Sequence, residues 1–139
     1  MEATWQRTMH ADLAELPPVL GEAEAFLDAH EMGPRTCYMV CLVLEELITN
    51  TIKYGYADAG QHTIAVDLLL EPTQVVLRLA DDGRPFDPLD LPPPQTDGDL
   101  EDRSVGGLGI HLVRSLAAAM SYRREADRNL VEVRFAREA

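Results

Sequence analysis

A carboxylate, a side-chain amide and an amine follow one another at helical spacing near the middle of the chain. Glu46 and Asn50 lie four residues apart, and Lys53 follows three residues later. Side chains at these separations are neighbours on a helix surface. The segment therefore offers a proton acceptor, a neutral oxygen ligand and a cation beside an apolar stripe. The same spacing is common on a solvated helix edge, so this pattern needs support from other segments.

A second candidate lies where an apolar strand is predicted to end. Asp81 is followed two residues later by Gly83, which allows a tight turn and a close approach of the backbone to a ligand. The Asp81 carboxylate can then accept a hydrogen bond from a ligand amine. Asp and Gly also favour ordinary turns at strand ends, so this segment alone leaves both interpretations open.

A glycine cluster opens a predicted helix further along the chain. Gly106, Gly107 and Gly109 let backbone N–H groups converge on an anion at the helix N-terminus, where the helix dipole also favours negative charge. The cluster matches neither a Walker A motif nor a G-x-G-x-x-G turn after a strand, which excludes P-loop and Rossmann sites. A flexible hinge is the alternative use of these glycines.

Apolar spacing predicts the elements that position these three segments. We expect an edge strand over 5–10, helices over 17–30, 34–54 and 109–120, strands over 62–70 and 75–79, a long loop over 81–107, and a final hairpin of 121–125 and 130–135 with its turn at 127–129. Because helices and strands do not alternate strictly, this order favours an α+β fold. We expect a two-layer sandwich with helices on one face of a mixed, mostly antiparallel sheet.

The charge balance limits the ligands that the chain can bind. Its 139 residues include 24 Asp and Glu against 12 Lys and Arg, a formal net charge of −12. Nucleic acids and anionic membranes are poor partners for such a chain, because both are bound through clustered cations. An anionic ligand must instead be held locally, by backbone amides, a divalent ion or a few placed cations.

Two further expectations concern the location of the protein and its cysteines. We expect a single domain over 1–139 in the cytoplasm, because the sequence shows neither an apolar leader nor a membrane-spanning run. Cys37 and Cys41 lie four residues apart in a predicted helix and therefore share one face. We expect them to be buried reduced thiols rather than zinc ligands, because no further Cys or His lies at ligand spacing.

The three segments, in this order and separated by a hairpin and a long loop, resemble the N, G1 and G2 boxes of the Bergerat-fold (GHKL) ATPases. This superfamily includes gyrase B, the Hsp90 chaperones, the histidine kinases and MutL. The similarity runs over residues 5–135 and looks closest to the bacterial anti-sigma factor serine kinases of the RsbW and SpoIIAB type. We favour this branch because 139 residues would not hold the phosphoacceptor helix of a histidine kinase or a second transducing domain.

The resemblance implies a histidine-kinase-like ATP-binding domain with ATP and Mg²⁺ as cofactors. Glu46 would be the base that aligns the attacking hydroxyl, Asn50 would ligate the Mg²⁺ that bridges the phosphates, and Lys53 would approach the phosphates. Asp81 would accept a hydrogen bond from the adenine amino group, with Gly83 making room for the base. These roles suit phosphoryl transfer, which depends mainly on positioning and charge neutralisation.

The resemblance also assigns the remaining segment and exposes two departures. The glycine cluster would supply the lid hinge and phosphate-binding amides, namely Gly106, Gly107 and Gly109, and residues 84–105 would form the ATP lid. Many relatives have D-x-G-x-G where this chain has Pro85 in place of the second glycine, which makes that corner stiffer. A threonine often found near the last hairpin is replaced by Asn129.

The function implied by the resemblance is that of an ATP-dependent serine-protein kinase and anti-sigma factor. It would phosphorylate a STAS-domain anti-anti-sigma partner and otherwise sequester a sigma factor, with a homodimer left open. The alternative is an ATP-binding interaction module that clamps a signalling partner without phosphoryl transfer. Glu46 favours the kinase, because a pure binding module has no need of a base.

Overall fold

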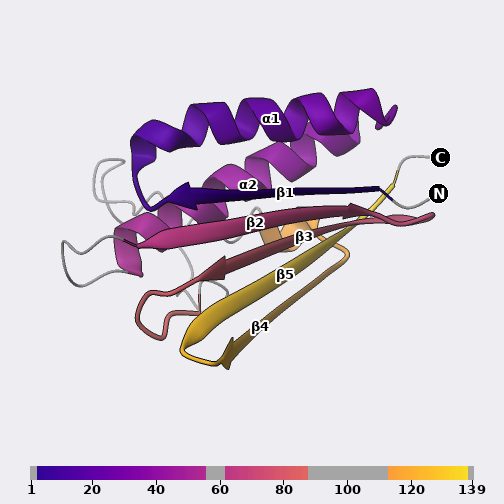
Figure 1. Ribbon diagram of the computed structural model, residues 1–139. Helices are drawn as coiled ribbons and strands as arrows, with labels where there is room; N and C mark the ends of the chain where they lie inside the picture. Colours follow the sequence, from indigo (N-terminus) through magenta and orange to yellow (C-terminus); the bar gives the residue numbers. More distant parts are fainter. Residues whose placement is uncertain (1–2, 56–61, 88–112, 138–139) are drawn as a thin grey trace, which may run out of the picture.

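The computed structural model describes residues 3–55, 62–87 and 113–137, which form two layers (Figure 1). Its elements are β1 (Ala3–His10), η1 (Leu13–Glu15), α1 (Leu16–Ala29), α2 (Pro34–Tyr54), β2 (Thr63–Leu70), β3 (Gln74–Asp81), β4 (Ala119–Glu125) and β5 (Arg128–Ala136). The strands form one sheet in the order β1-β2-β3-β5-β4, and α1 and α2 cover one of its faces. The predicted α+β sandwich is confirmed, and all four pairings within the described ranges are antiparallel.

The two long helices begin where prolines allow and bury one stripe each. The first turn of α1 and that of α2 both contain proline, whose missing N–H would have no partner there. The buried residues of α1 recur at helical spacing: Leu16, Val19, Ala23 and Leu27. Those of α2 include Val40, Leu44, Leu47 and Ile48. Burying each of the larger side chains contributes about 1.5–3 kcal/mol, so the two stripes fix which helix faces meet the sheet.

Gly55 ends α2 and cannot be replaced without a collision. Its N–H donates to the Thr51 carbonyl over 2.8 Å. A Cβ on Gly55 would lie 2.5 Å from the Thr51 carbonyl oxygen. The close approach of the last turn of α2 therefore requires glycine at this position.

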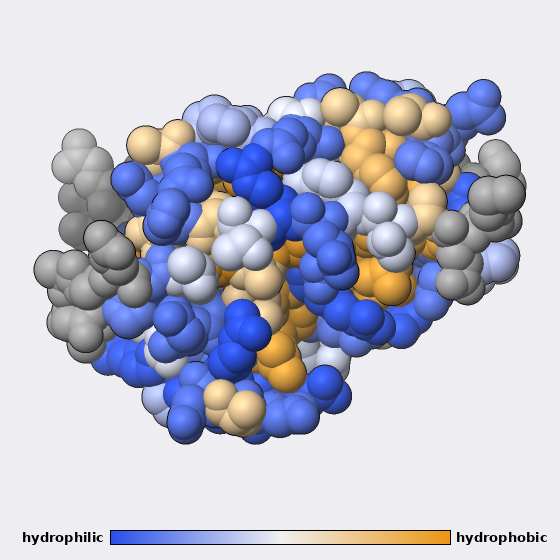
Figure 2. Space-filling model, viewed as in Figure 1, coloured by the Kyte–Doolittle hydropathy of each residue, from blue (hydrophilic) through white to orange (hydrophobic). Residues whose placement is uncertain are grey.

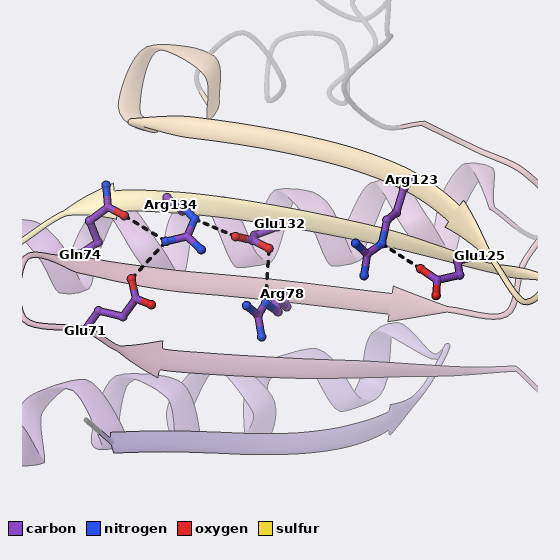
Figure 3. Close-up of polar contacts among 7 residues, drawn as sticks. All are labelled: Glu71, Gln74, Arg78, Arg123, Glu125, Glu132 and Arg134. Atoms are coloured by element: carbon purple, nitrogen blue, oxygen red, sulfur yellow. Dashed lines mark hydrogen bonds and ion pairs between the residues drawn. The ribbon is translucent and has the colours of Figure 1, made fainter. Parts of the chain in front are cut away.

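The sheet alternates between an apolar face under the helices and a polar opposite face. On β2 every second residue is buried: Ile64, Val66, Leu68 and Leu70. On the opposite face Arg78 pairs with Glu132 across the β3–β5 ladder over 3.4 Å, and Glu132 also pairs with Arg134 over 2.7 Å (Figure 3). This alternation leaves one face of the sheet for the helices and one for polar contacts.

The visible surface is mostly hydrophilic, interrupted by hydrophobic patches (Figure 2). This agrees with a composition in which acidic residues outnumber basic ones two to one. Within the described ranges, no helix has the length and apolar character needed to cross a membrane.

The end of the predicted last helix and the predicted last turn were wrong. Helical residues are described over 113–116, and β4 already begins at Ala119 instead of after Met120. Met120 pairs with Val133 of β5, so this apolar residue belongs to a strand and not to a helix. A short apolar segment fits either period, and here pairing with β5 decides the outcome.

The last hairpin turns one residue earlier than the predicted turn at 127–129. Ala126 and Asp127 adopt positive φ values of 51° and 60°, and Arg128 already pairs with Glu125. A two-residue turn with both residues in this region matches the twist of the flanking strands. As a result Asn129 lies within β5 rather than in the turn.

Candidate functional site

The sheet places Asp81, Asn129 and Arg124 in one row across three strands. Asp81, the last residue of β3, pairs with Asn129 of β5, and Asn129 pairs with Arg124 of β4. Directly opposed residues on neighbouring strands point to the same face. Asp81 is 3% exposed and Asn129 is 1% exposed, so these two residues are buried on the helix side of the sheet, whereas Arg124 at the end of the row is exposed.

The Asp81 carboxylate is held through one of its two oxygens. Its Oδ1 accepts hydrogen bonds from the Gly83 N–H over 2.9 Å and from Nδ2 of Asn129 over 3.0 Å. Burial raises the pKa of Asp81, whereas these two hydrogen bonds and the charge of Arg124 oppose that rise. Neither hydrogen bond uses Oδ2, which therefore keeps its capacity to accept from a ligand donor.

Asn129 connects this carboxylate to β4 and to the segment that follows β3. Its Nδ2 also donates to the Arg84 carbonyl over 2.8 Å. Its Oδ1 accepts from three donors: the Tyr122 hydroxyl (2.6 Å), an Arg124 guanidinium nitrogen (3.1 Å) and the Phe86 N–H (3.2 Å). Because both amide hydrogens of Asn129 are used, this side chain positions Asp81 and has no donor left for a ligand.

Arg84 joins this corner to the end of α2. Its backbone N–H donates to the Gly55 carbonyl over 2.9 Å, and its Nε donates to the Tyr54 carbonyl over 2.9 Å. The rings of Tyr54 and Phe86 pack with centroids 5.9 Å apart. The last carbonyls of α2 thus find partners in the segment after β3, which fixes Asp81 relative to the helix that carries Glu46.

Asn50 is buried and its amide nitrogen has no partner. The residue is 1% exposed, and its Nδ2 makes no hydrogen bond. An unpaired buried polar group costs about 1–3 kcal/mol, so a folded chain seldom keeps one without a use. Rotation of the amide by half a turn would present Oδ1 at the same place, and Mg²⁺ is commonly held by one or two protein oxygens together with substrate phosphates. The chemistry of Asn50 therefore fits the predicted metal ligand.

Glu46 lies one turn before Asn50 on α2 and is half-buried. Burial raises the pKa of Glu46, and the neighbouring charge of Glu45 raises it further. A carboxylate with a raised pKa is a better proton acceptor near neutral pH. Lys53 is exposed, and its Nζ lies 5.1 Å from the centre of the Tyr54 ring. The structure thus gives Glu46 and Asn50 the more protected positions of the predicted trio.

Part of the predicted site lies outside the described residues. This applies to Gly106, Gly107 and Gly109 and to positions 88–105 of the predicted lid. The described start of that segment, 84–87, is anchored to α2 and β5 as above. The sequence interpretation missed Arg124 and Tyr122 as partners of Asn129. Placing the turn at 126–127 would have revealed Arg124, because the hairpin register then sets it opposite Asn129.

Comparison with known families and proteins gives one consistent result. A family model described as a histidine kinase-like ATPase domain matches residues 9–135. The serine/threonine-protein kinase BtrW of Bordetella bronchiseptica is 30% identical over 92 residues, which cover 65% of this chain and 63% of that protein. The serine-protein kinase RsbW of Listeria monocytogenes is 28% identical over 79 residues, which cover 54% of this chain and 50% of that protein. The matches thus span about half to two thirds of these relatives.

Solved structures share the fold at low sequence identity. The RsbU and RsbW domains of a Mycobacterium tuberculosis protein align with a TM-score of 0.65 at 11% identity, covering 99% of this chain and 33% of that chain. A blue-light activated histidine kinase of Erythrobacter litoralis aligns with a TM-score of 0.57 at 17% identity, covering 86% of this chain and 41% of that chain. Both alignments support the two-layer arrangement of Figure 1.

Proposed function

Because this chain belongs to the histidine kinase-like ATPase domain family, we propose that it binds Mg-ATP beside α2 and transfers the terminal phosphoryl group to a serine hydroxyl of a protein partner. The observation that carries the proposal is the buried Asn50 amide whose Nδ2 has no partner, one helical turn from Glu46. Both curated relatives named above are serine or serine/threonine kinases, which supports the choice of reaction.

The adenine end of the proposed site is the corner after β3. Asp81 Oδ2 accepts from the exocyclic amino group, while Oδ1 stays bound to Gly83 and Asn129. A carboxylate favours an amine donor and disfavours a carbonyl oxygen at the same place, so this contact selects adenine over guanine. Gly83, which has no side chain, leaves room for the base.

The phosphate end of the proposed site is the face of α2 that carries Glu46 and Asn50. Asn50 would hold Mg²⁺, which when bound neutralises phosphate charge in a chain with few cations. Glu46 aligns the serine hydroxyl of the partner and accepts its proton late in the transfer. Lys53 reaches toward the phosphates from the last turn of α2, and the glycines of 106–109 supply backbone amides that bind them. Residues 84–105 form the lid over the nucleotide, and the whole of 1–139 is a single domain.

We further propose a cytoplasmic STAS-domain anti-anti-sigma protein as the phosphorylated partner and a sigma factor as the protein that the chain sequesters. The resemblance to RsbW-type kinases supports both assignments. A clamp that binds ATP and a partner without transferring phosphate remains the competing function, and the same experiment separates the two.

The test is transfer of label from γ-labelled ATP to a purified STAS-domain protein. Glu46→Gln keeps the size of the side chain and removes the base, so we expect transfer to slow by about 10²–10⁴-fold while ATP affinity stays within a few-fold. Glu22→Gln, a matched change on α1, should transfer at the wild-type rate. Wild-type chain that binds ATP and a sigma factor but labels no STAS protein would replace the kinase with the clamp.

A further inference from the structure

A groove runs along the surface between α1 and α2. It encloses about 620 Å³ and is lined by residues of both helices, among them Leu20, Gly21, Tyr38, Cys41 and Leu42. None of the residues proposed to touch nucleotide lines it. The groove is therefore separate from the proposed nucleotide site, and the proposed phosphoryl transfer does not account for it.

Gly21 keeps part of this groove open at a cost to the helix. A glycine inside a helix destabilises it by about 0.5–1 kcal/mol relative to alanine. A Cβ on Gly21 would meet no atom within 4 Å. Packing within the described chain thus does not require glycine at this position. What the missing side chain does provide is room for another backbone to approach α1 closely.

The opposite wall of the groove presents apolar surface to solvent. Tyr38 is a large exposed apolar residue, with 68% of its surface accessible. Cys41, Leu42 and Leu20 are half-buried along the same groove. Tyrosine at such a position can bury its ring against a partner and keep its hydroxyl in water, a combination enriched at interfaces.

The groove carries negative charge. Glu24, Asp28 and Glu45 line it, and no basic residue does so among the described lining residues. Burial raises the pKa of the Cys41 thiol to about 11, and the charges of Glu24 and Asp28 contribute to that rise. The negative charges of Glu24 and Asp28 therefore act inside the groove as well as at its rim.

We propose that this groove docks a helical segment of a partner protein that carries apolar side chains along one face and lysine or arginine beside them. Two packed helices leave a groove that accepts a third helix, and Gly21 permits the close approach. The three carboxylates select cations. A second copy of this chain is disfavoured, because it would bring another net charge of −12 to an acidic surface.

The test uses a fluorescent peptide of about 18 residues, built of leucine and lysine at amphipathic helical spacing, with the full chain as receptor. We expect binding measured by fluorescence anisotropy to weaken at least five-fold in Gly21→Leu, which fills the groove. It should be unchanged in Ala29→Leu, an exposed position of α1 outside the groove. Tyr38→Ala is a second variant that removes an exposed ring without disturbing the core. Glu24→Gln should weaken binding, whereas Glu31→Gln should not.

Three outcomes would overturn the proposal. The first is equal binding of the lysine peptide to the wild type, Gly21→Leu and Tyr38→Ala. The second is equal binding of a peptide in which glutamate replaces every lysine. The third is a wild-type dimer, seen by analytical ultracentrifugation, that Gly21→Leu converts to monomer, because the groove would then be an interface between copies. ATP titrations run alongside keep a failure of the docking groove separate from a failure of the proposed nucleotide site.

Discussion

The side-chain amide of Asn129 donates to Oδ1 of Asp81 over 3.0 Å, although 48 positions separate the two residues along the chain. The contact follows from the β3–β5 register, which sets them directly opposite each other. It occupies Oδ1 of the carboxylate and leaves Oδ2 for the proposed contact with adenine.

Asp81→Asn should abolish most ATP binding. The substituted amide can present a donor where the adenine amino group needs an acceptor. Isothermal titration of the full chain measures the effect. Asp82→Asn, at the neighbouring exposed carboxylate, is the control and should bind ATP nearly as the wild type does. Equal affinity in the wild type and Asp81→Asn would remove Asp81 from the adenine site.

The same substitution should change how stability depends on pH. Burial raises the pKa of Asp81, so the folded chain keeps this proton to a higher pH than the unfolded chain does. The stability that protonation provides is fully present below the unfolded pKa of about 4 and is lost as pH rises through the folded pKa. The free energy of unfolding, measured with urea from pH 4 to 7, should therefore rise steadily for Asp81→Asn relative to the wild type. A difference that does not vary with pH would contradict the assigned cause.

Arg124→Met should weaken ATP binding by about ten-fold and raise the acid limit of binding, the pH at which half of the ATP binding is lost. Arg124 donates to the Gly83 carbonyl over 2.8 Å and to Asn129, and its charge opposes the rise in the pKa of Asp81. Without that charge Asp81 accepts a proton at a higher pH. The pH at which ATP binding is half lost should therefore rise.

The control for Arg124→Met is Arg123→Met, which removes the same charge from the same strand. Arg123 lies on the opposite face of the sheet, paired with Glu125 over 3.1 Å (Figure 3). We expect no change in the pH profile of ATP binding in this variant. An identical shift in both variants would mean that net charge alone, and not the contact with the Asp81 corner, sets the acid limit.

Asn50→Leu should remove the Mg²⁺-dependent part of ATP binding without destabilising the free chain. The wild-type Nδ2 is buried and unpaired, and replacing such a group with an apolar one of similar shape is nearly neutral or stabilising. Urea unfolding and titrations with and without EDTA measure the two effects. A loss of more than about 2 kcal/mol of stability would show that the amide serves the fold instead.

Two glycine-to-alanine variants should change stability in opposite directions. Gly55→Ala places a Cβ 2.5 Å from the Thr51 carbonyl oxygen and should destabilise the chain by about 1–3 kcal/mol. Gly21→Ala adds a methyl group that meets no atom within 4 Å and should stabilise the chain by about 0.5–1 kcal/mol. Thermal and urea unfolding measure both. Destabilisation by Gly21→Ala would indicate that packing inside the chain requires this glycine.

Local sequence patterns were enough to predict the elements and most of their faces. Apolar spacing predicted α1, α2 and most of the strands, because side-chain direction follows from backbone geometry within one element. The order of these elements then predicted the two-layer fold. The spacing from Glu46 to Asn50 likewise placed both residues on one helix face. The ending of the last helix was wrong, since a short apolar run fits a strand as well as a helix.

Contacts between side chains that are distant in the sequence could not be predicted from local patterns. The contacts of Asn129 with Asp81, Arg124 and Tyr122 depend on strand register, and that register depends on a turn at 126–127 that composition alone does not locate. The unpaired Nδ2 of Asn50 and the open space beside Gly21 are likewise properties of packing. Local patterns fix the direction of a side chain, but its partners are set by elements far away in the chain, whose placement depends on the whole core.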